Sequence, residues 1–413
     1  MTMHILSKST YIKGLQCEKA LYMTKKHPYL RDRLSIEQWA KFQRGTDVGI
    51  LAQQYFPGGV NMAPKSPSQF PKRVKETMEN LNNPAVNVMY EAVFQYNDTL
   101  IMVDLLVRDG NQWKAIEVKS SLKLSTTYYN DAALQYYVLH GCGVPLSDFQ
   151  LMHISPDYVR HGDIDVKQLF QLVSVMDYAK EQEPVIAANV DRLKQVVALP
   201  HAPQVEVGPH CNDPYPCDFR GHCWKNIPQE DPNVPYSIDF KALFAQTPDP
   251  KPRNIAYLNL LIHRPAVPEL DDTKPYQDML LAYALSGDQE PEGHTVWDCF
   301  DDHSRWHEGI DALADQLKKY DLTVTFTPNE PFGFKVFNLY KVLENAQMFH
   351  PLFKGGFSLQ HSAQAMFHEA NLFEHSRIIV EALAQDFLSY EQARKDLITE
   401  NEVVKRIYQH FFK

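Results

Sequence analysis

The chain has 413 residues, which is more than one ordinary domain holds, so two or three domains are expected. Hydrophobic residues make up 44 % and aromatic residues 12 %, enough for packed cores, which excludes a disordered or fibrous protein. The longest apolar runs fall short of the roughly 20 residues that a membrane helix needs. Residues 1–9 lack the apolar stretch of a secretory signal. We therefore expect a soluble, cytoplasmic protein with no membrane partner.

The charge is unevenly distributed along the chain. In total 41 Lys and Arg stand against 51 Asp and Glu, a net charge of −10, which argues against a general nucleic-acid coat protein. Residues 1–75 nevertheless hold 13 basic and 4 acidic residues, net +9, and leave −19 to the rest. This asymmetry predicts one localised face for a polyanion, although an ordinary solvated helical face would have the same composition. The residues expected to guide a nucleic-acid strand are Lys8, Lys13, Lys25, Lys26, Arg31 and Arg33.

Hydrophobic periodicity predicts an α/β chain with a linker near its middle. Ser7 is a plausible cap for the first helix, and Asn97-Asp98 and Asp109-Gly110 are turn signals between strands. The predicted helices cover 10–17, 35–55, 129–140, 166–182 and 183–193, and the predicted strands cover 88–94, 99–108, 113–119 and 149–154. A first domain, 1–226, is followed by a polar, proline-bearing linker, 227–235. A second domain, 236–413, is expected to open with an apolar strand over 236–240.

Three residues on the predicted strands suggest a catalytic site. Asp104 lies in an apolar strand, where an unpaired carboxylate would cost several kcal/mol. Glu117 and Lys119 are two residues apart, so both side chains point to the same face of the next strand. Two carboxylates would hold Mg²⁺ or Mn²⁺, which activates water for phosphodiester hydrolysis. The lysine would orient that water or offset charge on the phosphorus. Alone, this spacing is a weak pattern.

The neighbouring residues strengthen the pattern. Glu91, on the preceding strand, is a possible third acidic ligand, and Asp131 and Gln135 lie one helical turn apart after Lys119. The order Asp104, Glu117, Lys119, Gln135 resembles the PD-(D/E)XK nuclease superfamily, and within it the RecB-like branch. This resemblance implies a restriction-endonuclease-like α/β core in which these four residues are catalytic. It also implies that Tyr136, after the helix Gln, contacts nucleic acid.

Four of the six cysteines form a split group. Clustered cysteines in an intracellular chain are first interpreted as metal or cluster ligands. Cys17 precedes the predicted nuclease core, and Cys211, Cys217 and Cys223 follow it. This layout resembles the CRISPR-associated and AddB-type exonucleases, and implies a helical lobe with a structural 4Fe-4S cluster that joins the ends of the domain. Zinc suits four thiolates equally by geometry, and the nearby residues His210 and His222 keep a mixed zinc site open.

The second half resembles the C-terminal part of a little-studied bacterial family, in which a DnaQ-like, RNase H-fold exonuclease domain follows the nuclease. Such an exonuclease needs four acidic residues to hold two metal ions. Lys241 stands where the first Glu is expected after Asp239, and Asn338 replaces a strand-ending Asp. Glu402 is about where the last Asp would lie. We therefore expect an inactive RNase H-like α/β domain that serves as scaffold, homodimer contact, partner-protein site or strand holder.

These observations predict a metal-dependent DNA nuclease with a 4Fe-4S cluster. DNA is favoured over RNA, and exonuclease action on single-stranded or end-bearing DNA is implied by the resemblance, in DNA repair or defence against mobile DNA. The alternative is a catalytically inactive nucleic-acid-binding or assembly subunit, because the second half has lost acidic residues and the first lacks the upstream His of many RecB-like nucleases. A zinc enzyme built on the cysteines is a third hypothesis, weakened because four ligands would leave no open position for water.

Overall fold

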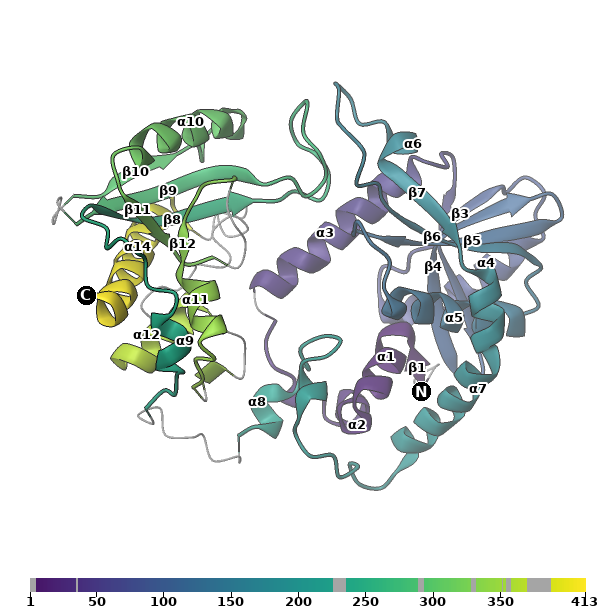
Figure 1. Ribbon diagram of the computed structural model, residues 1–413. Coiled ribbons are helices and arrows are strands. Elements are labelled where there is room, and N and C mark those ends of the chain that lie inside the picture. The colour runs from purple at the N-terminus through teal and green to yellow at the C-terminus, as the bar shows by residue number, and fades with distance from the viewer. Residues whose placement is uncertain are drawn as a thin grey trace. The chain divides into compact units, whose positions relative to one another are not determined.

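The computed structural model describes residues 5–34, 36–225, 235–288, 293–327, 332–350, 352–353, 358–369 and 388–413. The chain is an α/β protein with two mixed sheets, and it divides into two compact units (Figure 1). The first unit is Met1–Ile227 with Ala266–Pro275, and the second is Pro228–Pro265 with Tyr276–Lys413. The grouping of Ala266–Pro275 with the first unit departs from the predicted second domain. The predicted linker 227–235 lies outside the described residues, apart from residue 235.

The first unit consists of one seven-stranded sheet and the helices that connect and cover its strands. Its strands are β1 (Leu6–Ser7), β2 (Val60–Asn61), β3 (Val88–Tyr96), β4 (Thr99–Asp109), β5 (Gln112–Lys119), β6 (Leu146–Ile154) and β7 (Phe170–Ser174). Its helices are α1 (Lys8–Gln16), α2 (Glu18–Lys26), α3 (Ile36–Gln53), α4 (Phe70–Leu81), α5 (Thr126–Gly141), α6 (Val166–Leu169), α7 (Met176–Ala198) and α8 (Arg220–Cys223). Short 3₁₀ turns cover Pro28–Leu30, Pro67–Gln69 and Pro209–Cys211.

The sheet of the first unit has the order β2-β3-β4-β5-β6-β7, with β1 paired to β4. Strands β3, β4 and β5 form an antiparallel meander, and β6 runs parallel to β5 after the crossover helix α5. The predicted strands over 88–119 are confirmed, as is the turn at Asn97 and Asp98, whose φ angles of 46° and 59° suit a tight hairpin. The two helices predicted over 166–193 are wrong in part, because β7 pairs antiparallel with β6 before the single long helix α7 begins.

The N-terminal segment is held in place by a strand pairing and by a helix cap. Strand β1 places Leu6 beside Thr99 of β4. The predicted cap is confirmed, since the Ser7 side chain accepts from the Thr10 backbone N–H and the Thr10 side chain accepts from the Ser7 N–H. Helix α1 therefore begins at Lys8 with a defined direction.

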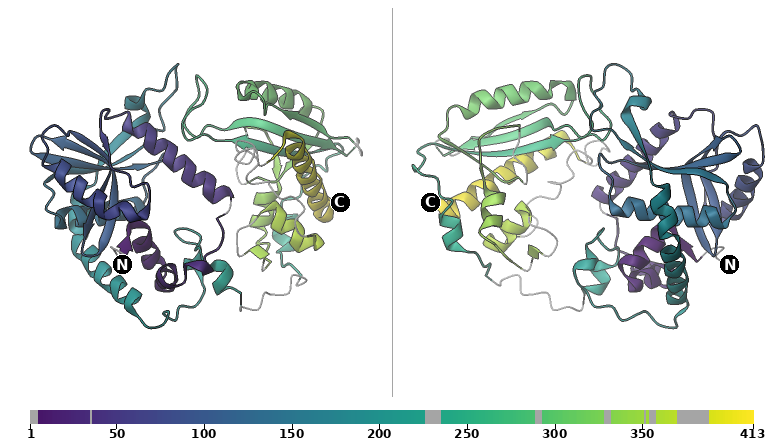
Figure 2. Two further views of the ribbon diagram at one scale, coloured as in Figure 1. Left: turned by 180° about the vertical axis from the view of Figure 1, so that it is seen from behind. Right: turned by 45° about the vertical axis from the view of Figure 1, so that its right-hand side comes forward.

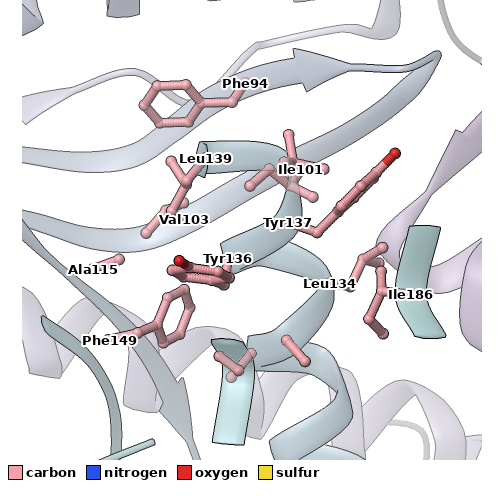
Figure 3. Packing of buried hydrophobic residues seen from close by; sticks show 14 of the residues in the cluster. Phe94, Ile101, Val103, Ala115, Leu134, Tyr136, Tyr137, Leu139, Phe149 and Ile186 are labelled. Atoms are coloured by element: carbon pink, nitrogen blue, oxygen red, sulfur yellow. The ribbon is translucent and has the colours of Figure 1, made fainter. Parts of the chain in front are cut away.

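The core of the first unit lies between the sheet and helices α5 and α7. Figure 3 shows Leu134, Tyr136 and Tyr137 of α5 among sheet side chains and Ile186 of α7. Nearly the whole middle of α5 is buried, so the helix is covered on more than one side. Burying such apolar side chains contributes roughly 1.5–3 kcal/mol each, which makes α5 a rigid support for the polar residues it carries.

The second unit has a five-stranded mixed sheet in the order β10-β9-β8-β11-β12. Strands β8 (Ile255–His263), β9 (Met279–Gly287) and β10 (Thr295–Asp298) are antiparallel, whereas β11 (Leu322–Thr325) and β12 (Phe337–Asn338) extend the sheet in parallel from β8. Its helices are α9 (Phe240–Phe244), α10 (Trp306–Leu317), α11 (Leu339–Asn345), α12 (Leu359–Phe367) and α14 (Tyr390–Phe412), with a 3₁₀ turn at His303–Arg305. Helices α10 and α14 cover opposite faces of this sheet (Figures 1 and 2).

The expected start of the second unit is wrong. Residues 236–240 form a single bridge between Ser237 and Phe349 rather than a strand, and Asp239 caps helix α9 by accepting from Lys241 and Ala242 N–H. Capping explains Asp239, since a carboxylate there satisfies helix N–H groups. The first strand of the sheet is β8 instead.

The other two positions singled out in the second half also have structural partners. Asn338 caps α11 by accepting from Tyr340 N–H. Glu402 pairs with His294 at 2.7 Å. Two residues before it, Glu400 is buried and accepts from Asn259 of β8. Among the described residues, no helix is long and apolar enough to cross a membrane.

Candidate active site and cysteine site

Three carboxylates lie in one transverse row across β3, β4 and β5. The register pairs Tyr90 with Leu105 and Ala92 with Val103, which sets Glu91 opposite Asp104. The β4–β5 ladder ends where Leu105 meets Ile116, so Asp104 and Glu117 follow at the next position. The predicted ligands Glu91, Asp104 and Glu117 therefore come together in the folded chain.

Regular strand geometry breaks at this row. Glu91 has a φ of 54°, a left-handed conformation that is rare for a non-glycine residue and uncommon in a strand. As a result Met89 and Ala92, three residues apart, both contribute to the core, which strict alternation would prevent. On β4, the Asp104 Oδ2 accepts a hydrogen bond of 2.7 Å from Val118 N–H, a group that leaves the ladder at this point. The regular β4–β5 pairing has ended at this point, so a backbone N–H of β5 is available to hold a carboxylate of β4.

Glu117 is the most connected residue of the site, with a side chain only 2 % exposed. Its Oε1 accepts from Lys119 Nζ at 2.8 Å and from Lys8 Nζ at 2.5 Å. Its Oε2 accepts from Gln135 Nε2 at 2.7 Å. The predicted helix Gln therefore holds one carboxylate oxygen, and two ammonium groups hold the other.

Lys119 lies between two buried carboxylates. Its Nζ donates to Glu117 and, at 2.7 Å, to Asp131 Oδ2, and it lies 4.9 Å from the centre of the Tyr128 ring. The Asp131 Oδ1 and the Gln135 Oε1 are buried without a hydrogen-bond partner among the described residues. Unsatisfied buried acceptors are rare in folded proteins and call for an explanation. Here they mark a position suited to a bound cation, water or donor group.

The pKa values of the two central carboxyl groups, Asp104 and Glu117, are shifted in opposite directions. Burial raises the pKa of Asp104 to about 8, and the nearby Glu117 and Glu91 charges add to this effect against Lys8. Burial alone would also raise the pKa of Glu117, but Lys119 and Lys8 outweigh it and lower this pKa to about 2. Burial likewise raises the pKa of Glu91. Three crowded carboxylates with opposed pKa shifts are typical of functional sites.

The four predicted cluster cysteines line one cavity. Cys17 lies in the extended link between α1 and α2, Cys211 in a 3₁₀ turn, and Cys223 at the end of α8. Cys217 completes the set, and its backbone N–H donates to Cys211 C=O at 2.9 Å. All four are free thiols, next to a small apolar cluster around Phe219. Burial raises the pKa of Cys217 to about 11, and the other three thiols contribute to the rise.

This donor set fits a four-thiolate cofactor. The cysteines come from segments far apart in sequence, form no disulfide and enclose a common space. Lys19 and Arg220, which also line the cavity, would offset the negative charge of a thiolate-ligated group. Cys142 and Cys299 lie elsewhere and donate to backbone carbonyls of Gln95 and Leu280.

The N-terminal helix joins the cysteine site to the carboxylate site. Lys13 of α1 forms an ion pair of 2.5 Å with Asp218, which lies between Cys217 and Cys223 in the sequence. Gln16 Nε2 donates to the His210 and Tyr215 carbonyls at 2.8 and 2.6 Å. The helix therefore has Lys8 of the carboxylate site at its first residue and Cys17 directly after its last.

The basic residues predicted to guide a strand have different surroundings. Lys8 contacts the buried Glu117, and both Lys13 and Arg31 pair with Asp218. Lys25 is half-buried, and burial lowers its pKa. Lys26 and Arg33 are exposed. A single open basic face therefore does not include all six residues, and the strand-guiding role stays a prediction for the exposed ones.

The position of Tyr136 in the structure does not support its predicted contact with nucleic acid. Its side chain belongs to the core, 6 % exposed, and its ring stacks on His140 at a centroid distance of 5.6 Å (Figure 3). A base could not stack on a ring covered in this way. Asp131, which holds Lys119, has no role in the predicted site, although its position one helical turn before Gln135 is a signal that the sequence contains.

Comparisons with known proteins identify no family for this chain. No family model matches it, and no curated protein matches it. Among solved structures it is similar to that of SSO0001, with 12 % identity, over 48 % of this chain and 77 % of that one, at a TM-score of 0.23. A similarity at this score carries no argument about fold or function.

Proposed function

We propose that the protein is a metal-dependent phosphodiester hydrolase acting on DNA. One observation carries the proposal: Glu91, Asp104 and Glu117 converge on neighbouring strands beside Lys119. Carboxylate oxygens are the ligands that Mg²⁺ and Mn²⁺ prefer. Glu91, Asp104 and Glu117 would hold such an ion, which when bound activates water and stabilises charge on the phosphate.

The remaining residues of the site have distinct roles in this proposal. Gln135 fixes one oxygen of Glu117 and thereby its orientation. Asp131 fixes Lys119 from the opposite side, so the ammonium group stays at the edge of the carboxylate row. Lys119 is placed to orient the attacking water or to stabilise the transition state. The hydrogen bond from Val118 N–H favours the ionised form of Asp104 and so opposes part of the rise in pKa that burial causes.

The four cysteines would hold a 4Fe-4S cluster, as the resemblance to RecB-like iron–sulfur nucleases implies. Its role would be structural, because the cysteines link the start and the end of the nuclease unit. The resemblance also suggests single-stranded or end-bearing DNA as the substrate.

The second unit is proposed to be an inactive RNase H-like domain. Three antiparallel strands followed by two parallel ones is the arrangement expected of that fold. Two of the polar groups buried inside it, Asn259 and Glu400, are hydrogen-bonded to one another. A scaffold or partner-binding role fits this composition.

A nuclease assay tests the proposal. The protein, purified without oxygen, would be incubated with Mg²⁺ or Mn²⁺ and linear or circular, single- or double-stranded DNA, with RNA in parallel. Asp104→Asn is the matched control, because the amide oxygen can still accept from Val118 while the charge is lost. We expect the parent to cleave DNA and the cleavage rate of Asp104→Asn to be at least about 100-fold lower, which is the effect of removing roughly one essential catalytic group. Absence of cleavage on every substrate, with the cofactor present, would favour the binding-subunit alternative.

A further inference from the structure

We propose that Lys8 is a phosphate-binding residue of the active site, supplied by the N-terminal helix. The inference rests on the proposed nuclease function and adds a second cation to the site. Sequence alone would assign Lys8 to a general basic surface, whereas its Nζ lies 2.5 Å from Glu117 Oε1. The two residues are 109 positions apart, so the contact belongs to the tertiary structure.

Two ammonium groups contact the same carboxylate oxygen but differ in their surroundings. Lys119 is 13 % exposed and is held on its other side by Asp131. Lys8 is 30 % exposed, and the contact that holds it is with Glu117. A divalent cation held by the carboxylates would neutralise the charge of Glu117. The more exposed ammonium, Lys8, would then be available to bind an anion.

The position of Lys8 is determined by several independent contacts. The β1–β4 pairing and the capping interaction of Ser7 with Thr10 fix the residues on either side of it. Further along the same helix, Lys13 binds Asp218 and Gln16 binds the cysteine segment. A lysine on a mobile surface needs no such support. A lysine that must meet a phosphate beside the carboxylate row does, because a functional group acts only from a fixed position.

The ligand is a phosphate of the substrate backbone. An ammonium group on a flexible stem binds phosphate as a point charge. Loss of one such contact weakens binding about tenfold, and it lowers the dependence of log affinity on log salt by about 0.7 for a single strand. The effect would be the same for every sequence, since the backbone carries no base information.

Lys8→Met, Lys8→Arg and Lys75→Met would be compared with the parent full-length protein. Lys75 is 80 % exposed on α4 and provides the same loss of charge away from the carboxylate row. Affinity for a fluorescent single-stranded oligonucleotide would be measured with Ca²⁺, under conditions without cleavage, at several salt concentrations. KM and kcat would be measured with Mg²⁺, and thermal unfolding would verify the fold of each variant.

Lys8→Met should weaken affinity and raise KM about tenfold with a smaller change in kcat, and reduce the salt slope by about 0.7. Lys8→Arg should restore most of the affinity, and Lys75→Met should match the parent. Unchanged affinity and KM in Lys8→Met would overturn the proposal. Equal losses in Lys8→Met and Lys8→Arg, with lower unfolding temperatures, would assign Lys8 a structural role and overturn it too. If the parent binds DNA without cleaving it, the nuclease proposal fails while the affinity measurements still decide the role of Lys8.

Discussion

Replacing Lys119 with Met should destabilise the first unit as well as stop catalysis. The Lys119 ammonium lies 2.8 Å from Glu117 and 2.7 Å from Asp131, and all three side chains are largely buried. In the variant, Glu117 keeps Lys8 and Gln135 as partners. Asp131 loses its cation while its second oxygen is already without a hydrogen-bond partner. The cost therefore falls mainly on one buried carboxylate.

The magnitude follows from the distance and the burial. At 2.7 Å and an effective dielectric constant of about 20, the attraction is about 6 kcal/mol. Desolvation of the pair offsets part of it, and removing one partner of a buried pair typically costs about 3–5 kcal/mol. We expect about 3 kcal/mol for Lys119→Met at pH 8, or a fall of roughly 6–12 °C in the unfolding temperature. Burial raises the pKa of Asp131 even beside Lys119. The cost should therefore shrink as the pH falls and Asp131 takes up a proton.

Urea unfolding of the metal-free protein at pH 8 and pH 5 measures this cost. The double variant Lys119→Met/Asp131→Asn should recover most of the lost free energy of unfolding, since the uncompensated charge is gone, and should remain inactive. A coupling free energy of about 2 kcal/mol between the two positions is expected. A Lys119→Met variant as stable as the parent, or a coupling near zero, would refute the buried arrangement on which the active-site proposal depends.

Three further predictions address the other parts of the molecule. The pKa of Asp104 is raised to about 8 by burial, above the roughly 3.9 of an unfolded chain, so the metal-free protein should lose stability as the pH rises from 4 to 8. Asp104→Asn should remove that loss. The variant and the parent should then have the same unfolding temperature at pH 4, and the variant should have the higher one at pH 8. If the two proteins have the same unfolding temperature at both pH values, the prediction is contradicted. Cys17→Ser should abolish bound iron and the brown colour by elemental analysis and absorption, and iron retained at the parent level would exclude Cys17 as a ligand. Tyr136→Phe should leave DNA affinity within about twofold of the parent by fluorescence anisotropy, because the side chain is buried; a tenfold loss would show that the Tyr136 hydroxyl contacts the nucleic acid.

Local features of the site could be predicted from the sequence. Glu117 and Lys119 share a face because strand side chains alternate, and Asp104 lies near them because a short hairpin at Gly110 joins β4 and β5. Both depend on residues close together in the chain. Gln135 was assigned to the site through the resemblance to RecB-like nucleases, and in the structure the crossover helix α5 brings it to Glu117 of β5.

Predictions that depended on burial or on a long-range partner were less secure. Tyr136 and Gln135 are neighbours on α5, yet one ring is enclosed in the core and one amide reaches the carboxylates. An apolar run at 236–240 had the composition of a strand, but among the described residues it pairs only through the bridge of Ser237 with Phe349, and Asp239 became a helix cap. Strand formation requires a partner, whereas a cap requires only the adjacent N–H groups.

The sequence by itself determined the three neighbouring strands within residues 88–119, the capping of α1 by Ser7, and the shared face of Glu117 and Lys119. Each of these depends on backbone periodicity and on hydrogen bonds between near neighbours. Only the tertiary structure decided that Lys8 reaches Glu117, that Asp131 holds Lys119, and that the four cysteines enclose one space. The physical reason is that a buried charge is stable only beside a partner. Which distant residue becomes that partner is decided by how the sheet and helices pack.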